Sequence, residues 1–107
     1  MSVSALAGLA LLAHGDTPET GRYSKNVLAL VKWILKAQDD CAVRQPNYKG
    51  LIFDRPTASS DDRAMHGHGF ALLFLAECYG MTRDPALRRR MHKAIRAGAL
   101  LTQKSMT

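Results

Sequence analysis

Residues 65–80 contain the most apolar stretch of the chain, with apolar side chains at nearly every position after the first five. No polar residue interrupts between positions 70 and 76, and Glu77 is the first charge after them. A helix that is apolar on every side must be covered on every side. Gly80 stands where a glycine commonly ends a helix. The pattern therefore predicts a buried helix over this stretch.

Residues 3–13 predict a second buried helix. Ser2 or Ser4 can cap its first turn, and Gly15 can end it. The segment is too short to span a bilayer, which needs roughly 20 apolar residues. A secretory signal peptide would begin with Lys or Arg, and none precedes this segment. We interpret it as part of the fold.

Two other segments are amphipathic. Residues 23–38 carry three lysines along one stripe and apolar side chains on the opposite side. Residues 86–103 repeat the pattern with arginines and lysines, and Asp84-Pro85 is a typical helix start. Each of these helices should have one side in water and the other in the core.

The two halves of the chain resemble each other. Gly15 and Gly80 are separated by 80 − 15 = 65 residues, and Gln38 and Gln103 by 103 − 38 = 65. Each half reads as an apolar helix, a short polar turn and an amphipathic helix. We therefore predict a single all-α domain over residues 1–107. Its two helical hairpins, about 2–38 and 65–103, stack against each other and are joined by a long loop over 39–64.

Composition adds little to this picture. The chain has 107 residues, a hydrophobic fraction of 47% and a net charge of +6, which suit one folded domain with a possible acidic partner. Two cysteines make no disulfide framework, so a reducing, cytoplasmic setting is the simpler expectation. Glu77 lies within an apolar helix. We expect either that a cation such as Arg96 or Lys25 pairs with it or that it marks the rim of a cavity.

His66 and His68 are the best candidates for chemistry. On the first turn of a buried helix, flanked by glycines, two imidazoles could ligate zinc or carry a proton, with Asp61, Asp62 or Cys41 completing the site. The alternative is that they bond to backbone and carboxylate groups of the loop and fix its path over the helix. Two histidines without a defined third and fourth ligand favour this alternative, so no cofactor is expected and zinc is the one candidate metal.

The run of arginines at positions 88–90 raises the question of nucleic-acid binding, which needs clustered positive charge. An outer helix needs a solvated side in any case, and no aromatic residue interleaves with these cations. We therefore do not expect a nucleic-acid partner, although a basic nucleic-acid-binding protein remains one alternative.

The motif Met-His-Gly-His-Gly at 65–69, followed by the helix to Gly80-Met81-Thr82, resembles the α/α-toroid repeat of terpene cyclases and protein prenyltransferase β subunits. The closest likeness is to bacterial prenyltransferase/squalene-oxidase repeat proteins. The resemblance implies stacked hairpins with apolar helices inside. It covers both halves of the chain without the middle loop.

The chain departs from that family in three respects. A full toroid stacks more than two hairpins. The cyclases use an Asp-rich acid motif, whereas this chain has the pairs Asp39-Asp40 and Asp61-Asp62. The Asp-x-Cys spacing of the prenyltransferase zinc site occurs at Asp39 and Cys41, but after an outer helix.

Three functions follow as hypotheses. The first is a toroid-repeat module without catalysis of its own, which acts by assembly or ligand binding, with self-association or the rest of a longer chain as partner. The second is a fragment of a terpenoid- or prenyl-processing enzyme, whose cavity takes an apolar small molecule. The third is the nucleic-acid binder.

Overall fold

The computed structural model describes residues 1–44, 49–52 and 62–105, without the side chains of residues 2, 44, 62–66 and 105. All regular structure in these residues is helical, as the sequence predicts. The four helices are α1 (Ser2–His14), α2 (Ser24–Arg44), α3 (Asp62–Met81) and α4 (Pro85–Ser105).

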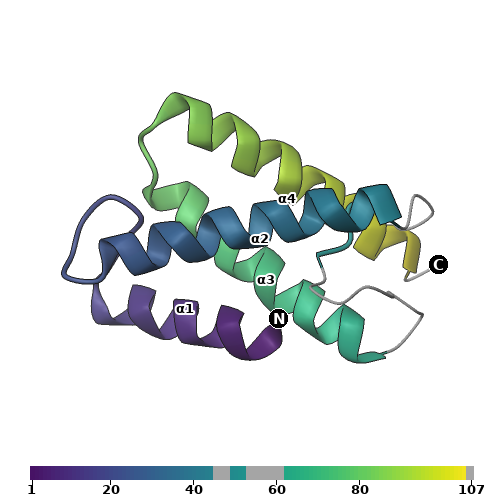
Figure 1. Cartoon of the computed structure of the whole chain (residues 1–107), viewed down its shortest axis with the longest axis horizontal. Coiled ribbons are helices and arrows are strands. Elements are labelled where there is room, and N and C mark those ends of the chain that lie inside the picture. The colour runs from purple at the N-terminus through teal and green to yellow at the C-terminus, as the bar shows by residue number, and fades with distance from the viewer. Residues whose placement is uncertain (45–48, 53–61, 106–107) are drawn as a thin grey trace.

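The helices are arranged as two hairpins, α1–α2 and α3–α4 (Figure 1). The helices α1 and α3 run in one direction and pack closely on each other, while α2 and α4 run back in the opposite direction (Figure 1). Gly8 permits the close approach of α1, because a Cβ there would lie 2.5 Å from both Leu30 and Phe74. The small residue thus brings three helices together at one crossing.

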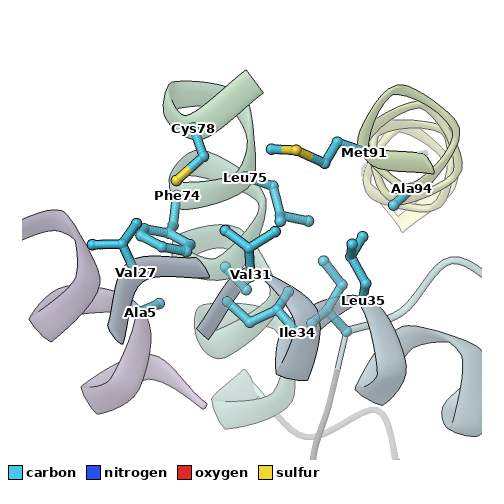
Figure 2. Close-up of a cluster of buried hydrophobic side chains, with 12 residues drawn as sticks. Ala5, Val27, Val31, Ile34, Leu35, Phe74, Leu75, Cys78, Met91 and Ala94 are labelled. Carbon is cyan, nitrogen blue, oxygen red and sulfur yellow. The ribbon is translucent and has the colours of Figure 1, made fainter. Parts of the chain in front are cut away.

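The core lies where the four helices meet. Phe74 of α3 is fully buried at its centre and points toward Val27 of α2, with Ala5 of α1 nearby (Figure 2). Met91 brings α4 into the same cluster. Burial of such side chains is the main favourable term in folding, at about 1.5–3 kcal/mol for each large one.

The α1–α2 turn is fixed by its own backbone and by one carboxylate. Gly15 adopts a left-handed conformation at φ 109°, and the amides of Gly15 and Asp16 donate to the carbonyls of Leu12 and Leu11. These two hydrogen bonds end the helix where the sequence predicts. The buried Asp16 carboxylate then accepts the Tyr23 amide at 3.1 Å, which lowers the pKa of Asp16. The predicted cap at Ser2 or Ser4 is wrong, because Met1 is the N-cap residue of α1 and its side chain forms no capping hydrogen bond.

The α3–α4 turn follows the predicted start signal. The Ala86 amide donates to the Asp84 side chain at 3.1 Å, as expected of an N-cap. Arg88 donates to the carbonyls of Tyr79 and Thr82, at 2.9 and 2.8 Å, and so supplies partners to the open end of α3. Across the molecule, the Arg83 amide donates to the Glu19 side chain and joins the two turns.

Two predicted helix ends are wrong. The helix α2 continues to Arg44, past Gln38, because no Gly or Pro interrupts it and Cys41 extends its buried side. Asp39 and Asp40 are therefore helical. Gly80 does not end α3, which runs to Met81 without a left-handed residue.

In the part of the chain that the structure describes, α3 is covered along one side, and its other side is partly exposed. The prediction that residues 65–80 form a helix buried on every side is therefore wrong for the single chain. Ala71, Phe74 and Leu75 are fully buried, whereas Leu73 is 48% exposed and Phe70 36%. The helix α1 also has an exposed apolar side, where Leu6 is 47% and Val3 79% exposed. The reason is that two hairpins supply too few neighbours for two helices that are apolar all round. None of the described helices is long and apolar enough to cross a membrane.

Candidate functional site

His68 occupies the centre of a buried polar cluster between α3, α4 and residues 49–52. Its side chain is fully buried. The Nδ1 atom accepts the Ile52 amide at 3.1 Å, so the proton of the neutral ring is on Nε2. That atom lies 3.1 Å from the Gly98 carbonyl and 3.0 Å from the Thr102 hydroxyl. Both ring nitrogens are thus bonded to the protein.

Gln38 forms the second arm of this cluster. It is buried, and its Nε2 group donates to the carbonyls of Gly50 and Ala94 at 3.0 and 2.9 Å. One amide therefore joins α2 to α4 and to the segment 49–52. An unpaired buried polar group costs about 1–3 kcal/mol, which explains why these groups are matched.

Two glycines allow the segment 49–52 and α3 to approach α4 this closely. Gly50 has φ 99°, and a Cβ on it would collide with the Ala97 carbonyl. A Cβ on Gly98 would lie 2.9 Å from Leu72 and 3.3 Å from the His68 ring. Gly50 therefore requires a residue without a side chain, because the colliding atoms belong to the backbone, whereas at Gly98 the Leu72 side chain would have to shift.

The chemistry of this cluster is that of a neutral, hydrogen-bonded histidine. Burial lowers the pKa of His68, although its bond to the Gly98 carbonyl works in the opposite direction. A metal would need Nδ1 or Nε2, and either would first have to give up a bond to the backbone. The arrangement matches the alternative in which the histidine fixes the path of the connecting segment.

The other candidate ligands do not join His68 within the described residues. The backbones of His66 and Asp62 belong to α3, but their side chains, and the whole of Asp61, lie outside the described residues. Cys41 is buried on α2. No group of three or more His, Cys, Asp or Glu side chains that could hold a metal occurs in the part of the chain described.

Cys78 is buried in the core beside Phe74, as expected for a cysteine in an apolar helix (Figure 2). Burial, together with the neighbouring Glu77 carboxylate, raises the pKa of its thiol to about 12. The thiolate is the reactive form of cysteine, so this side chain is chemically inert at neutral pH.

Glu77 is exposed, so the expected buried ion pair with Arg96 or Lys25 is wrong, whereas the alternative position at the rim of a cavity agrees with the structure. The helical period explains this, since the buried positions 71, 74, 75 and 78 leave position 77 on the outer side. Its carboxylate lies at a groove of about 260 Å³ between α1 and α3. The other groove residues are apolar: Leu9, Leu12, Ala13, Leu73 and Met81.

The exposed apolar residues of α1 and α3 form one surface, which we call the apolar outer face. Its positions recur at helical spacing along both helices, and Glu77 is the charged residue among those whose side chains the structure describes. The apolar members are Val3, Leu6, Ala7, Ala10 and Ala13 of α1 with Phe70, Leu73, Ala76, Gly80 and Met81 of α3.

The outer sides of α2 and α4 carry the positive charge, as the amphipathic pattern predicts. Their exposed cations are Lys25, Lys32 and Lys36 on α2 and Arg89, Arg90, Lys93, Arg96 and Lys104 on α4. Two arginines of the predicted cluster have partners within the protein. Arg88 lies over the Tyr79 ring at 4.2 Å, and Arg90 contacts Asp39 at 3.3 Å.

Gln38 was not anticipated from the sequence as a functional or structural residue. Its signal was its position, since it extends the buried series Val27, Val31 and Ile34 by one more turn. A polar residue on the apolar side of a helix indicates a buried hydrogen-bond network. The same rule places His68 on the buried side of α3 with Ala71 and Leu75.

Comparison with models of known protein families, with curated proteins and with solved structures finds no match for this chain.

Proposed function

We propose that this chain is a helical-hairpin repeat module of the α/α-toroid kind, without catalysis of its own, which works by assembly through the apolar outer face. The observation that carries the proposal is the exposure of this face. A protein surface seldom keeps so continuous an apolar area unless another surface covers it.

The arrangement of the hairpins supports the repeat part of the proposal. The equivalent helices α1 and α3 run in one direction, and α2 and α4 in the other (Figure 1). In proteins built of stacked hairpins, each repeat is covered by its neighbours, and the end repeats need a cap. Here α1 and α3 still present apolar side chains outward.

The bonding of His68 supports the absence of catalysis. A histidine that acts on a substrate or a metal needs one ring nitrogen available to it. Both nitrogens of His68 are bonded within the protein, to Ile52 on one side and to Gly98 and Thr102 on the other.

The test compares two double variants by sedimentation velocity and by binding of an apolar fluorescent dye. The first double variant, Leu6→Gln with Leu73→Gln, replaces two side chains of the apolar outer face. The control, Lys32→Gln with Arg89→Gln, replaces two exposed side chains on the charged side by the same residue. We expect the wild type to form a particle larger than one chain of 11.8 kDa or, as a monomer, to bind the dye.

In either case the first variant should lose the behaviour and the second should keep it. The proposal is wrong if both variants behave as the wild type does, or if the wild type is a monomer that binds no dye.

A further inference from the structure

We propose that a pocket at the turn between α3 and α4 binds a small organic phosphate, with arginines around the phosphate group and aromatic rings against the organic part. The turn joins the two helices of the second hairpin (Figure 1). The pocket beside it has a volume of about 530 Å³, which is within the usual range for small-molecule sites. Its lining residues are Tyr79, Arg83, Pro85, Arg88, Arg89 and His92. None of them belongs to the apolar outer face, so the proposal is independent of the proposed function.

Arg88 is the fixed part of this pocket. Its Nη1 atom donates to the carbonyls of Tyr79 and Thr82 at 2.9 and 2.8 Å, and its guanidinium carbon lies 4.2 Å from the centre of the Tyr79 ring. The guanidinium has further N–H donors on Nε and Nη2, in the paired geometry that matches two oxygens of one phosphate. Because the group is already held in place, binding an anion costs little further ordering of this side chain.

Two more arginines line the same pocket. Arg83 belongs to the turn and Arg89 to the beginning of α4, and both side chains are exposed. The carboxylates of Glu19 and Asp84 lie at this turn, and each accepts a backbone amide. A planar carboxylate would be matched by Arg88 alone. A tetrahedral phosphate has additional oxygens for Arg83 and Arg89, so phosphate is the anion that fits this lining best.

The rings beside these arginines indicate an organic part on the ligand. The ring centres of Tyr79 and His92 are 6.0 Å apart, and the ring planes are tilted by 38°. Pro85 adds an apolar surface to the same pocket. A ligand ring gains contact energy against such side chains beyond the area that it buries. Inorganic phosphate would use the arginines and leave this part of the pocket uncovered.

The convergence of these groups favours a small ligand over a nucleic acid. A protein that binds a single strand spaces its cations and stacking side chains along a track, so that successive phosphates and bases are each contacted. In this pocket the rings of Tyr79 and His92 and the guanidinium of Arg88 meet at one place. They match one phosphate with one ring attached.

Isothermal titration calorimetry of the full chain tests the proposal, with phenyl phosphate as the probe. We expect one molecule to bind per chain, and inorganic phosphate to bind about fivefold more weakly because it does not contact the rings. Phenol should not bind measurably. The proposal is wrong if phenyl phosphate does not bind at millimolar concentration, or if it binds no better than inorganic phosphate.

Two neighbouring arginines supply a matched pair of variants. Arg89→Gln removes an exposed cation of the pocket and should weaken phenyl phosphate binding about tenfold. Arg90→Gln makes the same change at the next position, where the side chain contacts Asp39 of α2 instead, and should leave the affinity nearly unchanged. Equal effects would mean that the protein attracts the anion by net charge alone, which would overturn the proposal.

Other sources of phosphate are separated by two further probes, single-stranded oligothymidylate and phosphatidylserine vesicles. We expect neither to bind more tightly than phenyl phosphate. Tight binding of either probe that both Arg89→Gln and Arg90→Gln weaken would assign these arginines to a macromolecular or membrane surface and overturn the proposal. The assembly of the chain is measured separately, through Leu6→Gln with Leu73→Gln, so either idea can fail without the other.

Discussion

The outer sides of the two helix layers differ sharply. Among the described side chains, the exposed positions of α2 and α4 are rich in Lys and Arg, although Trp33, Val43 and Leu100 are exposed there too. Those of α1 and α3 are Val, Leu, Phe, Met, Ala and Gly, with one His at the end of α1 and one Glu in α3. Both layers contribute to one core, and all four helices have a solvent side. The charged layer is what a monomer requires, so the apolar layer indicates a requirement beyond folding. The difference can be tested by pairs of variants that carry the same substitution, one at a buried position and one at an exposed position.

The largest difference is expected between two phenylalanines of α3. Phe74→Ala should destabilise the fold by about 3–5 kcal/mol, because it leaves a cavity where three helices meet. Phe70→Ala removes the same side chain from the apolar outer face and should cost a monomer far less. Urea unfolding at a concentration where the protein is monomeric measures both. Similar losses would mean that the two sides of α3 are equally buried.

A smaller difference is expected between the two glutamines at equivalent places in the hairpins. Gln38→Leu should destabilise the fold by about 1–3 kcal/mol, since the carbonyls of Gly50 and Ala94 lose their donor. Gln103 is exposed at the corresponding place in α4, and Gln103→Leu should change the free energy of unfolding little. If the two variants unfold alike, the buried amide does not stabilise the fold.

The third prediction concerns pH and the histidine of α3. The pKa of His68 is lowered in the folded state, so below about pH 6.5 the unfolded chain binds a proton that the native protein does not. Stability should therefore fall with acidification from pH 6.5 down to the native pKa, by at most about 1.4 kcal/mol per pH unit.

The control for this prediction is His68→Gln, measured by urea unfolding from pH 7.5 to pH 5. The stability gap between the wild type and this variant should narrow as the pH falls. The lowered pKa of Asp16 acts separately, below about pH 4, where its contribution to stability is lost. A constant gap down to pH 5 would show that His68 does not titrate differently in the two states.

The smallest effect is expected on the apolar outer face itself. Leu73→Gln should change the stability of the monomer by about 0.5 kcal/mol or less, because the side chain is half exposed and has no full set of neighbours to lose. Leu75→Gln, two positions away on the buried side, should unfold the protein at much lower urea. A large loss from Leu73→Gln in the monomer would mean that this side of α3 is already covered.

The sequence was a good guide to the helices and a poorer one to their surroundings. The helices themselves, the start of α4 at Asp84-Pro85 and the end of α1 at Gly15 were predicted correctly. Each of these features depends on a few neighbouring residues in the sequence. Gly80 looked like Gly15, but a glycine ends a helix only when the following residues turn away, and here Met81 continues it. The end of α2 was missed because Asp39 and Asp40 resemble loop residues, while the buried Cys41 sustains the helix.

The candidate site was predictable in part. The position of His68 on the buried side of α3 follows from period alone, and its structural role was one of the two predicted alternatives. Its partners Ile52, Gly98 and Thr102 come from distant parts of the chain, so their bonds depend on the tertiary fold. The exposure of Glu77 also depends on how many helices surround α3, which a sequence does not state directly.

The bond between the Arg83 amide and the Glu19 side chain acts at one end of the molecule, and the Gln38 and His68 bonds act toward the other. Two packed helices could otherwise slip by one turn and still find apolar contacts, because their side chains are similar along the length. A slip of one hairpin against the other would break polar bonds at both ends at once. These few directional hydrogen bonds thus fix the register of the two hairpins. The apolar side chains between the hairpins contribute most of the stabilisation.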